Sequence, residues 1–348
     1  MDKTVDLLKR CLEMRSPILL LGAGFSLSAK AGNGENLMLG RDLCKKLLTY
    51  VISPNINFLS KETQEDAEYF SKKGKLKDLC TIIRENNLLE QRNRLLQESF
   101  SKCTYDETES YSYLTTYDWP YIFTLNIDNL VEEIYKKQHK PLTCWKLTSE
   151  HYKEVYGQTV LVKLHGDVGD PDTYVFDDEE YQRFSENECW MLRKFSDLYV
   201  CHDLIIVGSQ FQERDIKIAL QKVFKFGCDN SDYHYFFISP GTFNAPVSDA
   251  LNNRSNFHHI QWTAKQFLDF LNNDISRPKD ALQSLCCQGV SFWNQQINDA
   301  QRQREDWELY YGKPSEPRDF YYSVDISREE QEEIANFINQ NSYGYIEL

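Results

Sequence analysis

Short apolar segments recur along the chain at wide intervals, and most of them are continuous instead of alternating with polar residues. Continuous apolar runs of this length are typical of strands that are buried on both faces of a parallel sheet. The segments expected to form strands are residues 18–21, 121–125, 160–164, 204–207, 235–238 and 259–262.

Helical patterns separate these apolar runs. Apolar residues recur at intervals of three and four over residues 37–51, 130–135 and 215–226, and again over 267–271. Strands that alternate with helices predict an α/β fold, with a doubly wound, mostly parallel, Rossmann-like sheet.

Two stretches do not fit this sheet. Residues 52–118 have few strand signals and a helical spacing with charged faces, which predicts a helical insert. Residues 274–348 contain 14 acidic and 7 basic residues, half of the net charge of −14. We therefore expect an α/β domain over residues 1–273, followed by an acidic, mainly helical extension over 274–348. The apolar end, residues 343–348, is typical either of a short terminal strand or of a polypeptide that continues.

The charge balance bears on the partners of the protein. With 39 basic and 53 acidic residues, the surface as a whole is a poor partner for a polyanion, because binding to phosphates depends on lysine and arginine. The sequence therefore disfavours direct nucleic-acid binding, and a local basic groove is the alternative. No apolar run approaches the 18 to 20 residues of a membrane helix, and the N-terminus lacks the features of a signal peptide. We expect a cytoplasmic protein without a membrane partner.

The ten cysteines are scattered, and none forms a Cys-x-x-Cys pair. A zinc ribbon needs such paired thiolates around one ion. The spacing therefore predicts reduced, mostly buried thiols and no metal site.

The first candidate for chemistry is the sequence Gly22-Ala23-Gly24-Phe25-Ser26 directly after the first apolar run. Glycines at a strand-to-helix turn let the backbone approach an anionic ligand, and a helix start supplies free N–H groups. The pattern lacks the third glycine of the general dinucleotide motif. A purely structural turn is the alternative.

The second and third candidates follow two further strands. Asn126 and Asp128 come directly after the run 121–125, where a neutral amide can orient a hydroxyl or a water and a carboxylate can stabilise a cation. Asp128 as a simple helix cap is the alternative. His165 follows the run 160–164, and an imidazole is the natural general base at neutral pH. A structural histidine is the alternative.

The fourth candidate is Gly208-Ser209 after the run 204–207. Small residues there suit a ribose or phosphate at the edge of the sheet. Asp215 further on is either a helix-start carboxylate or a ligand contact. Because the carboxyl ends of parallel strands share one edge, these four polar turns are expected to converge on one crevice.

The combination resembles the sirtuin superfamily. The motifs are GAGFS at 22–26, TLNID at 124–128, KLHGD at 163–167 and VGSQF at 207–211, and the resemblance spans roughly residues 15–272. It implies an NAD-binding catalytic domain in which Gly22, Ala23, Gly24, Ser26, Gly208 and Ser209 line the nucleotide, together with the catalytic motif residues Asn126, Asp128 and His165.

Two departures separate the chain from protein-deacylating sirtuins. The segment after the first motif, residues 29–36, does not match their Gly-Ile-Pro-Asp-Phe-Arg sequence, and their four-cysteine zinc module has no counterpart. The pattern is similar instead to bacterial sirtuin-like antiviral effectors such as the Thoeris NADase. That branch implies an NAD glycohydrolase that depletes NAD in antiphage defence. It also implies a homo-oligomer, or assembly with a sensor or ATPase partner or with a fused C-terminal region.

The chemistry of NAD cleavage suggests a role for each residue. Loss of nicotinamide leaves an oxocarbenium-like ribose, which a preorganised polar pocket stabilises. We hypothesise that Asn126 positions the ribose or the attacking water, that His165 is the base, and that Asp128 holds the ribose or supports the positive charge. Lysine deacylation and NAD or ADP-ribose sensing without turnover are the alternatives.

Overall fold

The computed structural model describes residues 3–147, 158–186, 190–191, 194–195, 198, 202–209, 233–241 and 256–275. The chain divides into two compact units, Met1–Pro278 and Lys279–Leu348, and all described residues belong to the first. The helix expected over 215–226 and the extension beyond residue 275 lie outside the described residues. The expected domain boundary therefore stays a prediction.

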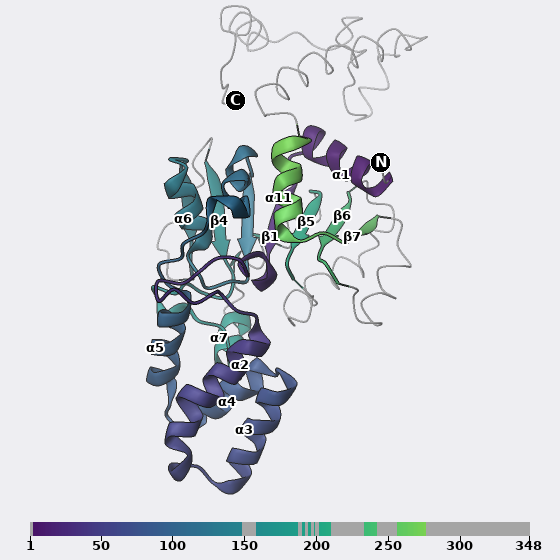
Figure 1. The fold of residues 1–348 in the computed structure, drawn as a ribbon. Helices are drawn as coiled ribbons and strands as arrows, with labels where there is room; N and C mark the ends of the chain where they lie inside the picture. The colour runs from purple at the N-terminus through teal and green to yellow at the C-terminus, as the bar shows by residue number, and fades with distance from the viewer. Residues whose placement is uncertain are drawn as a thin grey trace, which may run out of the picture. The chain divides into compact units, whose positions relative to one another are not determined.

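The described residues of the first unit form a seven-stranded sheet in which all neighbouring strands are parallel (Figure 1). The order β3-β4-β2-β1-β5-β6-β7 places the first strand at the centre. This arrangement confirms the predicted doubly wound α/β fold. The strands are β1 (Ile18–Leu21), β2 (Tyr121–Thr124), β3 (Leu142–Trp145), β4 (Thr159–Lys163), β5 (Leu204–Val207), β6 (Tyr235–Ile238) and β7 (Phe257–Ile260).

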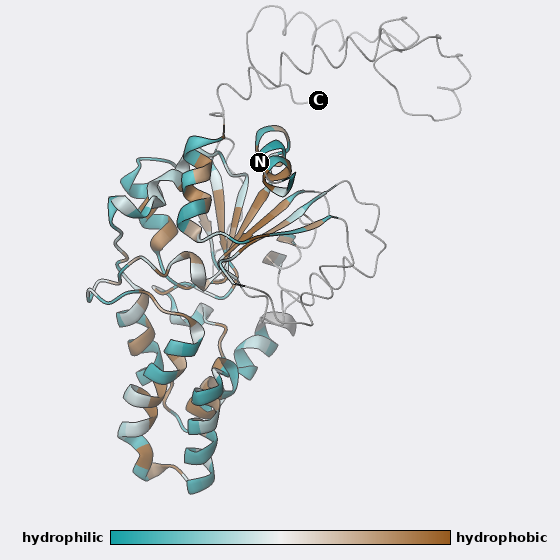
Figure 2. Cartoon of the chain, turned by 45° about the vertical axis from the view of Figure 1, so that its right-hand side comes forward, coloured by the Kyte–Doolittle hydropathy of each residue, from teal (hydrophilic) through white to brown (hydrophobic). Residues whose placement is uncertain are grey.

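The central strand shows why the strand segments are apolar throughout. In β1, Ile18 and Leu20 belong to one hydrophobic cluster, and Leu19 and Leu21 belong to another. Successive side chains of a strand point to opposite faces, so each face of the sheet carries its own core. All four side chains are fully buried, and the strands are accordingly among the most hydrophobic parts of the chain in Figure 2.

Helices cover one face, and the segment after β4 covers the other. The first core joins the sheet to helices α1 (Lys3–Met14), α6 (Leu130–Lys137) and α11 (Ala264–Asn273). The second joins it to the segment that contains α7 (Asp178–Glu186). A capping box starts α11, because Thr263 and Gln266 exchange side-chain-to-backbone bonds. Within the described residues, no helix is long and apolar enough to span a membrane.

The two edge strands differ most from the sequence expectation. Strand β3 was not predicted, and β7 begins two residues before the expected segment 259–262. Three of the four residues in each strand are only half-buried. Edge strands are covered less completely than central ones, so their sequences lack the continuous apolar run.

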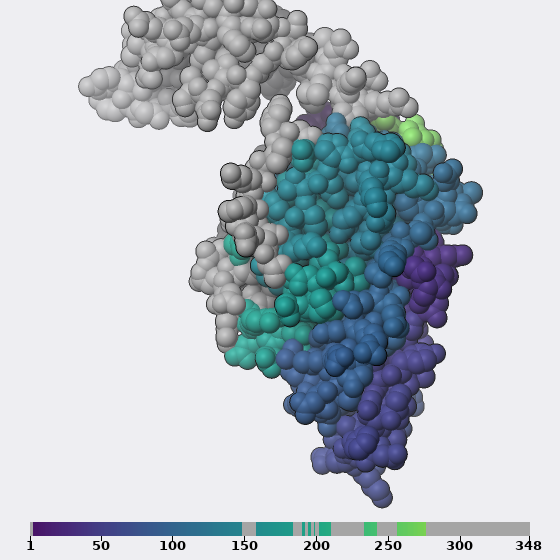
Figure 3. All heavy atoms as spheres, turned by 90° about the vertical axis from the view of Figure 1, so that its left-hand side faces the viewer, coloured from purple at the N-terminus to yellow at the C-terminus, as the bar shows by residue number. Residues whose placement is uncertain are grey.

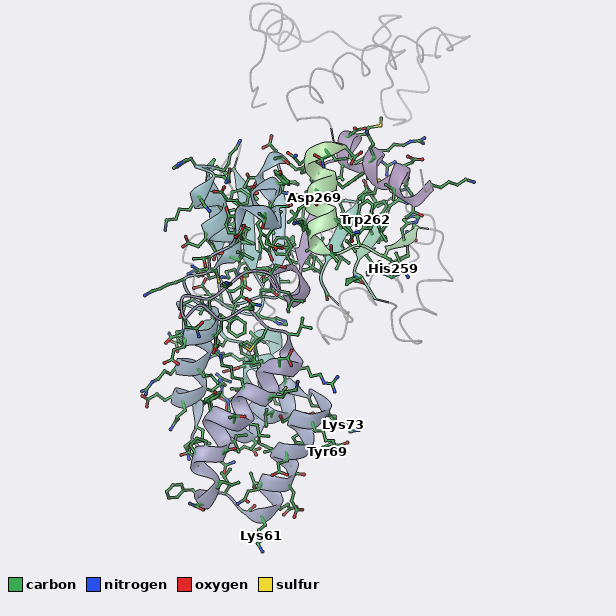
Figure 4. The ribbon with its side chains drawn as sticks, viewed as in Figure 1. Lys61, Tyr69, Lys73, His259, Trp262 and Asp269 are labelled. Atoms are coloured by element: carbon green, nitrogen blue, oxygen red, sulfur yellow. The ribbon has the colours of Figure 1, made fainter. Side chains whose placement is uncertain are left out.

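A helical lobe lies at one end of the sheet (Figures 1 and 3), and it begins at Gly40, before the insert that was expected over residues 52–118. It contains α2 (Gly40–Leu47) with a following π-helical turn (Leu48–Ile52), then α3 (Lys61–Lys73), α4 (Leu76–Glu85) and α5 (Leu89–Phe100). Ser60 caps the start of α3, and Gly74 ends it at φ +69°. Helix α3 carries Lys61 at the far end of the lobe, whereas Tyr69 and Lys73 lie nearer the sheet (Figure 4).

A buried ionic cluster fastens this lobe to α7. The guanidinium of Arg92 in α5 donates to Asp177 at 2.9 Å and to Glu180 at 2.6 Å. Arg84 in α4 contacts the same two carboxylates, both at 2.9 Å. Asp177 and Glu180 also exchange bonds with each other's backbone N–H, in the manner of a capping box. The helical lobe and the segment that follows His165 are therefore held together by paired charges.

Candidate functional site

The four candidate motifs lie at the carboxyl edge of the sheet. Residues 22–26 follow β1 and residues 208–209 follow β5, while residues 126–128 follow β2 and residues 165–167 follow β4. These are the four adjacent central strands. Strands β2, β3 and β4 lie on one side of β1, and β5, β6 and β7 lie on the other side. The strand order therefore changes direction between β1 and β5, and doubly wound folds bind ligands at such a position.

The loop after β1 and the turn after β5 are in direct contact. The N–H of Gly24 donates to Gly208 O at 2.8 Å, and that of Gly22 donates to Val207 O at 2.9 Å. A Cβ at Gly22 or Gly24 would lie 2.8 Å from Gly208 O. Gly208 has φ +73°, and its Cβ would lie 2.2 Å from Phe25 N. These glycines are required because two backbone segments touch there.

This contact corrects one expectation from the sequence. Free N–H groups were expected at the helix start after β1, but most of them donate within the protein. The bonds of Gly22 and Gly24 are those given above, and Phe25 and Ser26 donate to Gly22 O and Ala23 O. Among residues 22–26 of the described structure, only the N–H of Ala23 donates no hydrogen bond to a backbone oxygen. A bound anion would meet few backbone donors here.

Asn126 joins the turn after β2 to the loop after β1. Its Nδ2 donates to Ser26 Oγ at 3.0 Å and to Gly22 O at 3.1 Å. Thr124 Oγ1 accepts from the backbone N–H of Asn126. Both amide protons are used by the protein, so the remaining polar group of the side chain is its carbonyl oxygen, which can only accept. Asn126 is held as an acceptor.

Asp128 is buried, and its carboxylate has two roles in the fold. Its Oδ1 accepts from the N–H of Leu130 at 3.1 Å, at the start of α6. The side chain is also bonded to Ser26. Burial raises the pKa of Asp128 above its usual value, and the nearby Lys163 opposes this shift. The capping interaction that the sequence left open is present, and it coexists with a link to the Asn126 network.

His165 follows β4, and β4 pairs with β2, the strand that precedes Asn126. Thr124 pairs with Lys163 in the sheet, so Asn126 and His165 are each two residues beyond a paired position. The backbone pairing continues past the strands, because Leu164 N donates to Thr124 O and Val168 N to Ile127 O. The imidazole is buried and packs edge-on against the ring of Tyr181, with 5.8 Å between ring centroids.

A buried lysine lies between the turns after β2 and β4. Lys163 Nζ donates to the backbone oxygens of Ile127 and Asp128 and pairs with Glu132 and Asp167. The carboxylate of Asp167 also pairs with Lys146 at 3.0 Å. The charge and hydrogen bonds of the two lysines hold the pKa of Asp167 below its usual value, despite partial burial.

The candidate residues differ in accessibility. Gly22, Ser26, Asp128, His165 and Ser209 are buried, whereas Ala23, Gly24, Asn126 and Gly208 are partly exposed. The accessible part of the site is thus formed by the tips of two glycine-containing turns and by one amide. Of the predicted catalytic residues, Asn126 is partly exposed, whereas Asp128 and His165 are buried.

The described residues contain no group of three or more His, Cys, Asp or Glu side chains placed to hold a metal ion. Cys11, Cys44, Cys80 and Cys103 are buried free thiols, and Cys144 is half-buried. Burial raises the pKa of Cys44 to about 11, so this thiol is protonated at neutral pH. The other five cysteines lie outside the described residues.

Residues 120–270 match the family model described as the SIR2-like domain. This range covers less than half of the chain, from the start of β2 into α11. It includes Asn126, Asp128, His165, Gly208 and Ser209, whereas the loop 22–26 lies outside it. No protein of curated function matches the chain.

Two solved structures with similarity to the chain are Sir2 proteins. One is described as "Structural Basis for the Mechanism and Regulation of Sir2 Enzymes". It aligns over 78% of this chain and 96% of its own, with 11% identity and a TM-score of 0.37. The other is described as a Sir2 homolog–NAD complex and aligns over 80% and 94%, with 10% identity and a TM-score of 0.37.

The sequence analysis assigned no role to Lys163, Glu132 or Asp167. One signal was present, because Lys163 is a charged residue at the end of an apolar strand segment. Its partner Glu132 lies 31 positions earlier in the chain, so the pairing became visible only once the order of the strands was known.

Proposed function

We propose that the chain hydrolyses NAD to nicotinamide and ADP-ribose, or to a cyclic form of the product, with Asn126, Asp128 and His165 as catalytic residues. The main support is the junction of Asn126 with Ser26 and Gly22, at 3.0 and 3.1 Å. This junction brings one motif of the SIR2-like match against the glycine loop. It lies where doubly wound sheets bind nucleotides.

The reaction breaks the bond between C1′ of the ribose and the nicotinamide nitrogen. The electron pair of this bond moves to the pyridinium ring, so nicotinamide leaves neutral and positive charge develops on the ribose. The oxygen of a water molecule then bonds to C1′, and His165 takes the proton that this water loses. The products are nicotinamide, ADP-ribose and one proton, which balances the reaction.

The other two side chains act on the ribose and on the water. Asn126 presents a carbonyl oxygen, because its amide protons are held by Ser26 and Gly22. That oxygen accepts from a ribose hydroxyl or from the attacking water and fixes its direction. Asp128 supplies negative charge behind the ribose when its carboxyl group is ionised, and its burial strengthens the interaction with a developing cation.

The nucleotide half of NAD is assigned to Gly22, Ala23, Gly24 and Ser26 together with Gly208 and Ser209. The absence of side chains on three of these residues lets a ribose or diphosphate lie directly on the backbone. Most backbone N–H groups of this loop already donate within the protein. We therefore expect the binding of the nucleotide to depend more on the shape of the two turns than on hydrogen bonds to its phosphates.

The cellular role follows from the resemblance of the motifs to antiviral effectors. We propose that loss of NAD through this activity arrests infected cells. A homo-oligomer, or a sensor or ATPase partner, would control when the site acts.

The test is nicotinamide release from NAD, measured at several protein concentrations with the product identified by mass spectrometry. Asn126→Ala and His165→Ala should abolish release while the circular dichroism spectrum is retained. Asn272→Ala and His139→Ala are matched controls, because both side chains are exposed and neither residue belongs to one of the four motifs. Release at the parental rate by both site variants would refute the assignment.

A binding module without turnover is the second candidate. The observation that favours it is the burial of His165 and Asp128, which are 6% and 7% exposed. In that case, ADP-ribose and NAD bind with similar affinity and NAD is recovered intact. An acetyl-lysine peptide added to the same assay tests deacylation, which would consume NAD only in the presence of the peptide.

A further inference from the structure

One buried cation organises the region where the Asn126 and His165 turns meet. Lys163 is the last residue of β4, and its side chain is fully buried. Its Nζ lies 2.7 Å from Asp128 O, 3.2 Å from Ile127 O and 2.8 Å from both Glu132 Oε1 and Asp167 Oδ2. These four acceptors belong to the turn after β2, to the first turn of α6 and to the turn that contains His165.

The sheet itself does not require a lysine at this position. The three preceding residues of β4, Val160, Leu161 and Val162, are apolar and equally buried. Burial of an ammonium group carries a desolvation cost that an apolar residue would avoid. The lysine differs from an apolar residue in one respect: a single atom can bond the carbonyls of one turn and a carboxylate of the other.

The bonds of Lys163 Nζ hold both the turn after β2 and the turn after β4 at a fixed distance from the same atom. The bonds to Ile127 O and Asp128 O hold the backbone on either side of the Asp128 side chain. The pair with Asp167 holds the residue two positions after His165. Asp167 is itself fixed by Lys146 and by the N–H of Gly169. Movement of either turn relative to the other would therefore stretch bonds to the same nitrogen.

We propose that Lys163 is a positioning residue: it holds the turn that carries Asn126 and Asp128 in register with the turn that carries His165. This inference rests on the proposed function, because it concerns the alignment of the same three side chains. The bonds of Lys163 within the described residues go to Ile127, Asp128, Glu132 and Asp167 and not to residues 22–26 or 208–209, so we do not expect it to contribute to binding of the nucleotide half.

The decisive variant is Lys163→Met, which keeps an unbranched side chain and removes the charge. It leaves the carboxylates of Glu132 and Asp167 facing each other without the cation, so the two turns move apart. Displacement of a catalytic group by about 1 Å costs on the order of 100-fold in rate. We therefore expect kcat to fall about 100-fold, while the dissociation constant of ADP-ribose, used as the binding probe, changes less than about threefold.

A second variant separates positioning from charge compensation. The triple variant Lys163→Met/Glu132→Gln/Asp167→Asn removes the cation together with both carboxylates, so it restores folding if Lys163→Met fails to fold. It lacks the bonds between the turns, and its kcat should stay low. If kcat returns to the parental value in the triple variant, Lys163 only balances buried charge and the proposal is overturned.

Two controls address general effects on the fold. Lys136→Met makes the same substitution at an exposed position of α6. Leu8→Ala destabilises α1, which precedes the amino end of β1, through loss of a fully buried side chain. Both should keep kcat within about threefold of the parent at a temperature where they are folded. A 100-fold loss in Leu8→Ala would show that destabilisation alone explains the effect, and would overturn the proposal.

Failure of the proposed function is distinguished by a readout that needs no turnover. If the parental chain alone releases no nicotinamide, turnover cannot report on the position of His165, and positioning is then tested by NMR on protein labelled with ¹³C-histidine. The signal of His165, assigned with His165→Gln, should shift in Lys163→Met and in the triple variant, whereas that of His139 should not. An unchanged His165 signal overturns the positioning role.

Discussion

Replacement of Gly208 by alanine tests the contact between the two glycine turns. The new Cβ would lie 2.2 Å from Phe25 N and 2.6 Å from the carbonyl carbon of Gly24, both backbone atoms. The residue would also have to keep φ +73°, which costs an L-residue roughly 1–2 kcal/mol. Overpacking against atoms that cannot rotate away adds about 1–3 kcal/mol. We expect the free energy of unfolding to fall by roughly 2–5 kcal/mol.

Gly34 provides a control with the same backbone conformation and no crowding. It has φ +84°, and a Cβ there meets no atom within 4 Å. Gly34→Ala should therefore cost only the roughly 1–2 kcal/mol of the left-handed conformation. Urea unfolding followed by tryptophan fluorescence gives both free energies under identical conditions. Equal costs for the two variants would show that the turns do not touch as described, and the steric argument would be wrong.

The remaining predictions concern buried charges and the network around Asn126. Arg92→Met should lower the free energy of unfolding by about 3–5 kcal/mol, because it leaves Asp177 and Glu180 buried with one fewer cation. Glu90→Gln, which removes an exposed pair with Arg94, should change it by less than about 1 kcal/mol in the same urea assay. Asp128→Asn should stabilise the protein at pH 7. The pKa of Asp128 is raised by folding, so ionisation of this carboxyl group lowers the stability of the native protein as the pH rises above about 3.9, the pKa of an aspartate in the unfolded chain, and an asparagine avoids that loss. Asp167→Asn should do the opposite, because the lowered pKa of Asp167 adds stability that is lost only as the pH falls through its folded value. The free energy of unfolding of each variant is compared with that of the parent from pH 7 to pH 3. At pH 7 the two differences should have opposite signs, and both should become smaller as the pH falls. Differences of the same sign at pH 7 would contradict the causes assigned to the pKa shifts. Ser26→Ala should reduce kcat about tenfold through loss of one bond to the amide of Asn126, which single-turnover measurements of nicotinamide release would detect.

The central part of the fold could be predicted because its strands are buried on both faces. The segments 18–21, 204–207 and 235–238 coincide with β1, β5 and β6. Such strands have continuous apolar sequences, which are visible without any knowledge of neighbours. In contrast, β3 contains half-buried Leu142, Thr143 and Cys144, and nothing in this pattern separates it from a loop.

The sequence predicted that the candidate residues follow the carboxyl ends of strands, as the structure has them, but it did not show how they are held. The position of Asn126 after a strand was enough to predict its place at the carboxyl edge. Its bonds to Ser26 and Gly22 join positions about 100 residues apart, and sequence distance gives no sign of them. The same holds for Arg92 and Asp177, which have the composition of surface residues and are almost fully buried as a pair.

The place of β1 in the sheet has a consequence for synthesis of the chain. This strand is translated first, yet its two neighbours begin at Tyr121 and Leu204. At about 5–20 residues per second, a ribosome needs on the order of ten seconds or more to reach the second neighbour. During that interval, the four aliphatic side chains of β1 have no completed sheet to pack into, so we expect the nascent polypeptide to be prone to aggregation. The central part of the sheet can therefore be completed only after β5 has been synthesised, although β1 is available from the start.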